Sequence, residues 1–356
     1  MKKYDLVISL GETCLTAMTL SHLNIRTKSY PFDWSAGVIP ERAGNAGFLG
    51  KINLICNYFK NAFEKEDFKE FNYAQPGEHR FVRNLSTGLQ YIHDFPWNVS
   101  MDEYFTEFKE KYSRRIKRLY DDIKKSESIL FIFIARWSFL PLEDIVKGSE
   151  LLKSFFADKK INLLILQHDN YMDKFSYKEF YFLKDITYIK YNDYDLMQGR
   201  QFGNFVMLRR ICCKHILDAD YISFLYEDVD NIGLSTKEDV ARWSMSKHVL
   251  IKIPYIYKEG MSILFNIIPF INEKVPHQNI TIKANGKNVG NWNFVFGQEY
   301  HSASIDIPKD ALMDSDELYL EFFIPNAASP YELELSNDIR TVGIGFIDMI
   351  IKKHHN

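Results

Sequence analysis

Short apolar runs alternate with amphipathic stretches over the first 250 residues of the chain. The apolar runs predict strands at residues 4–10, 88–93, 129–135, 162–167 and 186–190. The runs at 129–135 and 162–167 are apolar almost throughout, which is typical of parallel strands that are covered on both faces. Apolar residues at helical spacing predict helices at residues 13–23, 101–125, 142–157, 202–217 and 237–248, with further short helices between 36 and 71. This alternation predicts an α/β domain with a mostly parallel sheet over residues 1–250.

The predicted helix at residues 101–125 has a clear start signal. Ser100 precedes it and is a good N-cap residue, because its hydroxyl can accept a backbone hydrogen bond at the helix start. Glu103 stands three residues later, which completes the spacing of a capping box. The sequence therefore predicts that this helix begins directly after Ser100.

Near Pro254 the pattern changes from helical spacing to a period of two. Residues 280–284 alternate between apolar and polar, and Asn285-Gly286 follows, a dipeptide that favours a type I′ hairpin turn. Similar alternation returns at residues 305–307, 318–322 and 341–351. Several short strands with almost no helix signal predict a jelly-roll-like β-sandwich domain over residues 255–356.

Composition and charge narrow the classes of function. The chain has 356 residues, of which 46% are hydrophobic, and this suits two domains with separate cores. Its 44 basic and 47 acidic residues give a net charge of −3, so we expect no nucleic-acid partner. No apolar run reaches the ~18 residues needed to cross a bilayer, and the amino terminus lacks the apolar core of a signal peptide. We therefore predict a cytoplasmic protein without a membrane span, and the oligomeric state stays open.

The four cysteines are Cys14, Cys56, Cys212 and Cys213. They form no Cys-x-x-Cys pair, and they are too few for a disulfide framework in a chain of this length. The sequence also lacks a phosphate-binding loop, a G-x-G-x-x-G motif after a strand and an H-E-x-x-H motif. We therefore expect no cofactor and no metal.

Cys14 differs from the other cysteines in its position. It follows the first predicted strand and opens the first predicted helix, and α/β sheets bind ligands beyond the carboxyl ends of their strands. The N–H groups and the dipole of a helix start lower the pKa of a thiol and can stabilise an oxyanion. Cys14 is thus a candidate nucleophile, and the alternative interpretation is a small buried apolar residue.

A cysteine nucleophile needs a base and a third group that orients the base. His93 and His168 both end predicted strands and are candidates, although strand-end histidines also occur as plain surface residues. Asp94 faces away from His93, because neighbouring residues of a strand alternate between faces. Asp33, in the loop at residues 29–34, is the better candidate to support the base.

Two adjacent arginines, Arg114 and Arg115, lie on the predicted helix at residues 101–125. Guanidinium groups bind phosphate or carboxylate well, so this pair could hold an anionic part of a substrate. The alternative, which the spacing favours, is a solvated helix face.

Four short segments stand out in combination. They are Ser9-Leu10-Gly11-Glu12-Thr13-Cys14, Ser29-Tyr30-Pro31-Phe32-Asp33-Trp34, His93-Asp94-Phe95 and Tyr112-Ser113-Arg114-Arg115. Together they resemble a bacterial family of unknown function that is described as papain-like cysteine peptidases, over roughly residues 4–225. This resemblance implies that Cys14 is the nucleophile and His93 the base. It also implies a papain-like α+β fold as the alternative for the first domain.

The carboxyl-terminal region carries a second set of motifs. They are Asn285-Gly286, Trp292, Ser329-Pro330, Ser336-Asn337-Asp338-Ile339-Arg340 and Gly343-Ile344-Gly345. These resemble a β domain that is attached to glycosyltransferases of capsule and surface-polysaccharide clusters, over about residues 255–352. The resemblance implies a role facing glycans or in assembly. The alternative is a purely structural sandwich in which Asp338 and Arg340 form a packing ion pair.

These observations predict a cysteine-dependent hydrolase or acyl-type transferase that acts on a carbohydrate precursor of surface (capsule) polysaccharide. The predicted catalytic residues are Cys14, His93 and Asp33. The predicted substrate contacts are Glu12, Thr13, Trp34, Arg114, Arg115, His168 and Asp169. Two alternatives stay open. One is a glycosyl- or phosphoryl-transferase that uses a nucleotide-activated donor and in which Cys14 only packs; the other is a non-catalytic glycan-binding protein with an exposed aromatic face around Trp292 or Tyr300.

Overall fold

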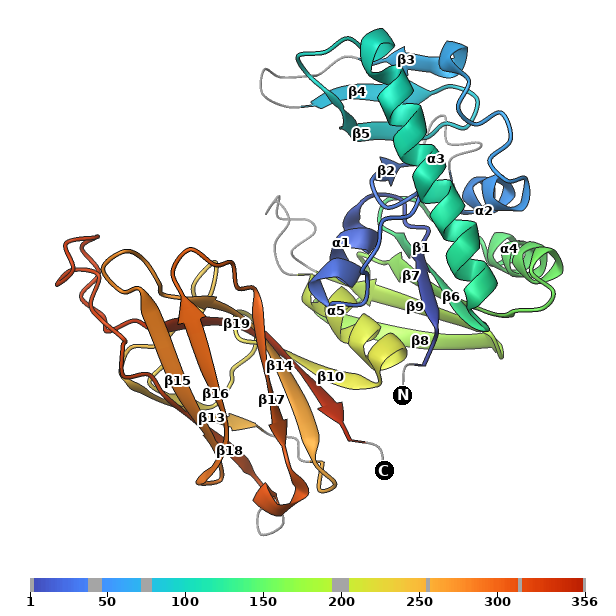
Figure 1. The fold of residues 1–356 in the computed structure, drawn as a ribbon. Helices are drawn as coiled ribbons and strands as arrows, with labels where there is room; N and C mark the ends of the chain where they lie inside the picture. The colour runs from blue at the N-terminus through green and yellow to red at the C-terminus, as the bar shows by residue number, and fades with distance from the viewer. Residues whose placement is uncertain are drawn as a thin grey trace. The chain divides into compact units, whose positions relative to one another are not determined.

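The computed structural model describes residues 3–37, 47–71, 79–193, 205–253, 257–312 and 316–354. The chain divides into two compact units, Lys2–Arg209 and Arg210–Asn356, each with its own sheets (Figure 1). The boundary predicted between residues 250 and 255 falls inside the second unit, because strands from residue 219 onward already pair in its sheets.

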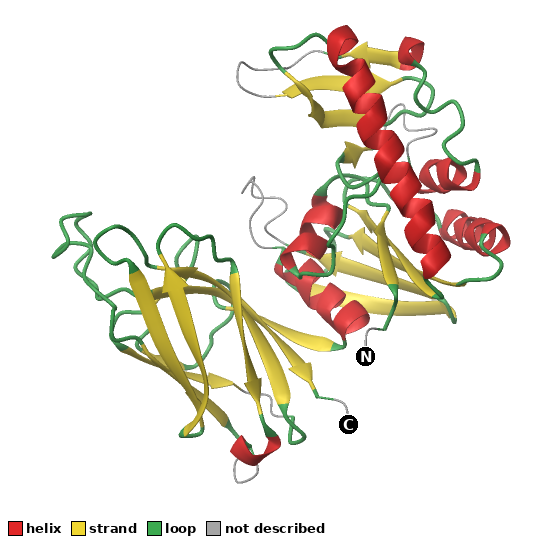
Figure 2. Ribbon diagram, viewed as in Figure 1, coloured by secondary structure: helices red, strands yellow, loops and turns green. Residues whose placement is uncertain are grey.

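The first unit is a mixed α/β structure around a mostly parallel sheet of five strands (Figure 2). The strand order is β1 (Leu6–Ser9), β6 (Ser128–Ala135), β7 (Lys160–His168), β9 (Ile186–Asn192) and β8 (Ser176–Leu183). The first four strands run parallel, and β8 pairs antiparallel with β9 at the edge. The predicted mostly parallel sheet is confirmed.

The helices of this unit lie on both faces of the parallel sheet (Figure 1). They are α1 (Leu15–His22), α2 (Phe48–Cys56), α3 (Met101–Lys125) and α4 (Leu142–Phe155). Helix α5 (Val206–Cys212) crosses the boundary between the two units, and a π-helical turn at Cys213–Leu217 follows it in the second unit. Residues 129–135 of β6 are all buried, as their continuous apolar run predicts. Odd-numbered residues of β6 join one core with α2, α3 and α4, and even-numbered residues face the opposite side.

A second, antiparallel sheet of four strands was missed by the sequence analysis. Its order is β2 (Ser35–Ala36), β5 (Gln90–Pro96), β4 (His79–Asn84) and β3 (Phe68–Glu70). The strand predicted at residues 88–93 is part of β5 and so belongs to this sheet. The short helices predicted between residues 36 and 71 correspond to α2 and a 3₁₀ turn at Lys65–Asp67, whereas residues 38–46 lie outside the described part of the chain.

Helix α3 joins the two sheets of the first unit (Figure 1). Its start is the predicted capping box: the Glu103 N–H donates to the Ser100 hydroxyl at 3.2 Å, and the Ser100 N–H donates to the Glu103 carboxylate at 3.2 Å. Near this end, the Phe108 ring packs on Phe95 of β5 with centroids 4.5 Å apart. Near the other end, Asp122 accepts a hydrogen bond from the Tyr30 hydroxyl at 2.8 Å. One helix therefore contacts both β5 and the loop that follows α1.

The second unit is a β-sandwich of two five-stranded antiparallel sheets. One sheet has the order β10 (Ala219–Ser223), β19 (Ile344–Lys353), β14 (Met261–Pro269) and β17 (Ser302–Ile307), with β12 (Arg242–Trp243) also paired to β19. The other has the order β11 (Asn231–Ile232), β13 (His248–Ile253), β18 (Leu318–Phe323), β15 (His277–Ala284) and β16 (Lys287–Val295). The finer jelly-roll-like assignment stays a prediction.

The core of the sandwich is aromatic. Phe265 of one sheet packs edge-on against Trp292 and Phe322 of the other, each with centroids 5.6 Å apart. Trp292 is buried, so it supplies no exposed aromatic face. The hairpin between β15 and β16 turns at Asn285 (φ 47°) and Gly286 (φ 82°), and the positive φ at both residues agrees with the predicted type I′ turn.

The helix predicted at residues 237–248 is wrong. Arg242 and Trp243 form β12 and pair with Phe346 and Gly345 of β19, and His248 begins β13. The segment has apolar residues at helical spacing, but Val240 is 61% exposed and the Arg242 guanidinium donates to the Ser235 carbonyl instead. Pairing with a strand 100 residues away outweighs the local helical pattern.

We expect Ser100→Ala to lower the free energy of unfolding of the first unit by about 1 kcal/mol, because the first turn of α3 loses its capping hydrogen bond. Ser113→Ala is the matched control, since the Ser113 hydroxyl only bonds the Lys109 carbonyl within α3 and alanine favours a helix. Urea unfolding followed by circular dichroism measures both. Equal midpoints for the two variants would contradict the assigned cap.

Candidate active site

The turn between β1 and α1 places Cys14 at the carboxyl edge of the parallel sheet. The Leu10 N–H donates to the Ile132 carbonyl at 2.8 Å, which extends the pairing of β1 with β6. At Gly11, a Cβ atom would lie 1.7 Å from Oγ1 of Thr16, so the turn has no room for a side chain there. Cys14 is the N-cap residue of α1, and its thiol is partly buried.

The structure brings Cys14 to His93, although 79 residues separate them along the chain. The Cys14 Sγ lies 4.0 Å from Nε2 of His93. His93 is an exposed residue of β5, and the rings of Trp34 and His79 approach its imidazole edge-on, each with centroids 6.1 Å away. The nucleophile and base predicted from the sequence are therefore within reach of a proton transfer.

Both members of this pair are neutral near pH 7. Burial raises the pKa of the Cys14 thiol, although its own backbone N–H and the positive charge of Arg136 act in the opposite direction. Although His93 is partly exposed, partial removal of its imidazole from water lowers its pKa, with a further contribution from His79, while Asp94 opposes this shift. The helix start was expected to lower the thiol pKa, but removal of the thiol from water outweighs that effect.

Glu12 holds the loop that follows β6. Its buried carboxylate accepts hydrogen bonds from three successive backbone N–H groups, those of Arg136 (2.7 Å), Trp137 (2.9 Å) and Ser138 (3.0 Å). The Ser138 hydroxyl donates to the same carboxylate. Glu12 was predicted to contact substrate, but these bonds use its oxygens to tie the nucleophile turn to the neighbouring strand.

Lys51 of α2 is a buried lysine that supports the same turn. Its side chain is fully buried, and its ammonium donates to the Gly11 carbonyl. The Phe32 ring centroid lies 5.5 Å from Nζ. Burial lowers the pKa of Lys51 to about 7, although the negative charge of Glu12 opposes this shift. The Lys51 side chain thus binds the backbone of the same turn whose Glu12 carboxylate binds the loop after β6.

The structure does not bring Asp33 to His93. Asp33 is buried, and its Oδ2 accepts hydrogen bonds from Arg26 Nε at 2.8 Å and from the Tyr30 N–H at 2.7 Å. In the described part of the chain no hydrogen bond joins it to His93. The Arg26 guanidinium in turn lies over the Trp34 ring, 5.5 Å from its centroid, and Trp34 contacts His93. Any influence of Asp33 on the base is indirect, through Arg26 and Trp34.

The two arginines of α3 have different surroundings. Arg115 is only 12% exposed and lies 3.8 Å from the buried Asp94, which also binds Lys111 at 2.7 Å and the Tyr112 hydroxyl at 2.8 Å. Asp94 therefore faces α3, away from Cys14, as strand alternation predicts. Arg114 is 64% exposed and lies 3.9 Å from Glu110, which agrees with a solvated helix face. None of these contacts places Arg114 or Arg115 beside the Cys14 thiol.

Thr13, His168 and Asp169 complete the predicted substrate contacts. The Thr13 hydroxyl accepts a hydrogen bond from the Leu15 N–H at 3.3 Å, within the turn itself. His168 ends β7 at the same edge of the sheet as Cys14. Asp169 is already engaged, because its carboxylate pairs with Lys190 at 2.9 Å and that contact lowers its pKa.

Lys51 and Arg136 are the site residues that sequence reasoning missed. A signal for Lys51 existed, because it stands on the apolar face of α2 with Phe48, Ile52 and Ile55 at spacings of three, one and four residues. A lysine in such a position has a buried partner. Arg136 directly follows the buried strand β6, and this strand-end position was the available signal.

Within the described residues, no group of three or more His, Cys, Asp or Glu side chains is arranged to hold a metal ion. In the same part of the chain, no helix is both long and apolar enough to span a membrane.

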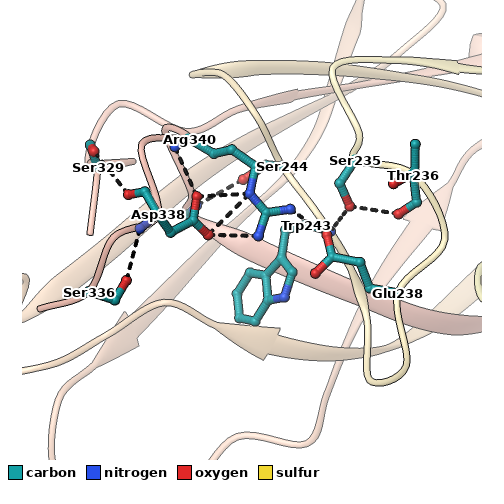
Figure 3. Close-up of polar contacts among 10 residues, drawn as sticks. Ser235, Thr236, Glu238, Trp243, Ser244, Ser329, Ser336, Asp338 and Arg340 are labelled. Atoms are coloured by element: carbon teal, nitrogen blue, oxygen red, sulfur yellow. Dashed lines mark hydrogen bonds and ion pairs between the residues drawn. The ribbon is translucent and has the colours of Figure 1, made fainter. Parts of the chain in front are cut away.

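In the second unit, Asp338 and Arg340 form the predicted ion pair (Figure 3). The Arg340 guanidinium bonds both carboxylate oxygens of Asp338, with Nε–Oδ1 at 2.9 Å and Nη2–Oδ2 at 2.7 Å, and it also donates to Glu238. These contacts tie the loop before β19 to the loop before β12. Both Arg340 and Asp338 are about one-third exposed, so the pair lies at the rim of the sandwich.

Comparison with known families matches part of the first unit. The family described as "Putative papain-like cysteine peptidase (DUF1796)" matches residues 5–155, a range that includes Cys14 and His93. This match confirms the resemblance over that range and suggests at most a cysteine-dependent hydrolase. It gives no support for a link to capsule or other polysaccharides.

The chain is also similar to an uncharacterized protein, R408, of Acanthamoeba polyphaga mimivirus. The two are 28% identical over 195 residues, which is 48% of this chain and 80% of that protein. A solved two-domain esterase active on acetylated mannans is 9% identical, with a TM-score of 0.27 over 65% of this chain and 74% of that chain. A 4-O-methyl-α-glucuronidase is 8% identical, with a TM-score of 0.24 over 36% of this chain and 16% of that chain. At these TM-scores neither likeness carries an argument.

We expect the stability contributed by Lys51 to rise with pH. Its pKa of about 7 lies below the ordinary lysine value of ~10.4, so between these values the unfolded chain binds a proton that the folded protein releases. The unfolding free energy of Lys51→Met relative to the natural protein should therefore fall by roughly 2 kcal/mol between pH 6 and pH 9. Urea unfolding at both pH values measures this.

Lys117→Met is the control for that experiment, because Lys117 lies on the exposed face of α3. Its relative stability should be nearly the same at pH 6 and pH 9. If the unfolding free energy of Lys51→Met changes with pH by the same amount as that of the natural protein, Lys51 keeps its charge in the folded state between pH 6 and pH 9.

Proposed function

We propose that the chain is a cysteine-dependent hydrolase or acyl transferase in which Cys14 is the nucleophile and His93 is the general base. The observation that carries this proposal is the 4.0 Å approach of the Cys14 Sγ, at the start of α1, to the Nε2 of His93 in β5. The contact lies at the carboxyl edge of a parallel sheet, where such folds bind ligands. The family match over residues 5–155 supports the same assignment.

Because Cys14 and His93 are both neutral, the thiol has to give its proton to His93 before or during its attack on the substrate. The His93 Nε2 accepts the thiol proton as Cys14 Sγ attacks the acyl carbon, so a C–S bond forms and the carbonyl oxygen becomes negative. Backbone N–H groups at the start of α1 stabilise that oxygen. The leaving group then departs with the proton from His93. Water or an acceptor hydroxyl, deprotonated by His93, attacks the thioester, the C–S bond breaks, and the Cys14 sulfur takes that proton back from His93.

The residues around the pair have supporting roles in this proposal. Trp34 limits the movement of the His93 ring by its edge-on contact, and Asp33 and Arg26 hold Trp34. Thr13 stands in the nucleophile turn and is the proposed contact for the part of the substrate that enters there. Lys51 and Glu12 fix the turn from the protein interior.

The finer proposal for the substrate is a carbohydrate precursor of a surface polysaccharide that carries an acyl group. It rests on the resemblance of residues 255–352 to β domains attached to glycosyltransferases. In this proposal the second unit faces the glycan and the first unit carries out the acyl chemistry. A transferase of glycosyl or phosphoryl groups is the second candidate, favoured by the burial that raises the pKa of Cys14. This second candidate function requires that the protein binds a nucleotide sugar and that its activity survives Cys14→Ala.

We expect p-nitrophenyl acetate to acylate Cys14. The thiol attacks the ester carbonyl, p-nitrophenolate leaves, and the protein gains one acetyl group as a thioester. His93→Ala should slow this step about 10²- to 10⁴-fold, because the general base is lost. The measurement combines the absorbance of p-nitrophenolate with intact-protein and peptide mass spectrometry.

Cys56→Ala is the matched control, since the Cys56 thiol only approaches the Leu151 carbonyl at 3.9 Å. It should react as the natural protein does. If Cys14→Ala is acetylated at the same rate as the natural protein, or if Cys14 carries no acetyl group, the nucleophile assignment is wrong and nucleotide-sugar binding becomes the next test.

A further inference from the structure

We propose that the loop after β6 binds a hydrocarbon chain on the acyl group that Cys14 attacks. The binding surface is formed by Trp137, Phe139 and Leu142, which we call the apolar strip. This inference rests on the proposed function and deepens it, because it names the class of acyl group that the site selects. Trp137 and Phe139 are the specificity-determining residues in this proposal.

The apolar strip exposes large apolar side chains within one short segment. Phe139 is 74% exposed, Trp137 56% and Leu142 42%, whereas Leu140 between them is buried in the core of the first unit. A single exposed apolar residue is common on a protein surface, but several in one place indicate a surface that binds something. The segment directly follows the buried strand β6, at the edge of the sheet where ligands bind.

Two buried polar side chains hold the backbone of this loop. The Glu12 carboxylate accepts hydrogen bonds from the N–H groups of Trp137 at 2.9 Å and Ser138 at 3.0 Å. Gln167 of β7 accepts a hydrogen bond from the Leu140 N–H at 3.0 Å and donates to the Ser138 carbonyl at 2.9 Å. The loop is therefore ordered before any ligand arrives, and a preordered surface loses less conformational entropy on binding.

The apolar strip begins beside the nucleophile. Glu12, which binds the Trp137 N–H, stands two residues before Cys14. The side chains indicate the same proximity: the Arg136 guanidinium lies over the Trp137 ring, 4.6 Å from its centroid. Burial raises the pKa of the Cys14 thiol, and the positive charge of the same arginine opposes this shift. Trp137 is thus linked to Cys14 through the backbone and through a side chain.

The proposed reaction fixes where the acyl chain begins. The acyl carbon bonds to the Cys14 sulfur, so the rest of the acyl group extends from that point. The leaving group has to reach the His93 imidazole, which belongs to β5 of the antiparallel sheet. The loop after β6 belongs to the parallel sheet instead. We therefore assign the acyl chain to the apolar strip and the leaving group to the side of His93.

The chemistry of the loop favours a hydrocarbon chain over a sugar ring. The Ser138 hydroxyl, which lies between the two exposed aromatic residues in the sequence, donates to the Glu12 carboxylate. The Ser138 carbonyl and the Leu140 N–H are bound by Gln167. The hydroxyl groups of a sugar need hydrogen-bond partners when they leave water, whereas an alkyl chain needs none. The substrate class that fits is an acyl compound with several CH₂ groups.

Two esters test this inference on the full chain. p-Nitrophenyl acetate and p-nitrophenyl hexanoate both acylate a thiol with loss of p-nitrophenolate, and they differ only in the length of the acyl chain. We expect the hexanoate-to-acetate rate ratio at Cys14 to be about tenfold higher than for free N-acetylcysteine, because the added CH₂ groups leave water on the apolar strip. Absorbance gives the rates, and peptide mass spectrometry identifies the acylated cysteine.

Variants show whether the apolar strip causes this preference. Trp137→Ala and Phe139→Ala should each lower the ratio about threefold, and the double variant should return it to the value of N-acetylcysteine. Tyr58→Ala is the matched control: Tyr58 is 66% exposed, but its ring packs on Phe155 at the far end of α4. It should keep the natural ratio. A natural ratio equal to that of N-acetylcysteine, or a high ratio in the double variant, would overturn the inference.

A second readout keeps this inference distinct from the proposed function. If neither ester acylates Cys14, the nucleophile assignment fails, and the apolar strip is then judged by binding of hexanamide, an uncharged probe that needs no thiol. Saturation-transfer NMR should detect hexanamide on the natural protein and on Tyr58→Ala, and the double variant of Trp137 and Phe139 should lose the signal. The absence of such a difference, or stronger transfer to methyl glucoside than to hexanamide, would refute a strip for hydrocarbon chains.

Discussion

Two buried ionisable side chains, Glu12 and Lys51, hold the turn that carries the candidate nucleophile. The carboxylate of Glu12 binds the N–H groups at the start of the loop after β6, and the ammonium of Lys51 binds the carbonyl of Gly11. Each charge is costly to bury alone, and each is stabilised by polar backbone groups that the sheet already places there. The turn therefore keeps its shape only while β1, β6 and α2 are packed together, so Cys14 depends on the folding of the whole first unit.

The base depends on a different part of the fold. His93 lies on the antiparallel sheet, and the next residue, Asp94, anchors β5 to α3 through Tyr112, Lys111 and Arg115. Alternation along the strand makes this possible, because it sends one side chain to the helix and its neighbour toward the thiol. Asp94 and its partners on α3 thus hold the strand that carries His93, the proposed base.

Sequence patterns predicted the features that arise from local periodicity and turn chemistry. The buried strand β6, the capping box at Ser100 and the hairpin at Asn285-Gly286 are all of this kind. Patterns failed where distant pairing decides the structure, as for Arg242 and Trp243, which join β19. The same holds for the site: the Cys14–His93 pair was proposed from motifs, whereas the contacts of Lys51 and Arg136 depend on segments that only the folded chain brings together.

Cys14 follows a strand of the parallel sheet and His93 lies in the antiparallel sheet, and both sheets pack against one long helix. Helix α3 has 25 residues, which corresponds to a length of about 37 Å. Over that length, a rotation of about 1.5° around one end would displace the other end by about 1 Å. The distance between the Cys14 sulfur and the His93 imidazole therefore depends on how α3 packs along its length, because both sheets contact this helix.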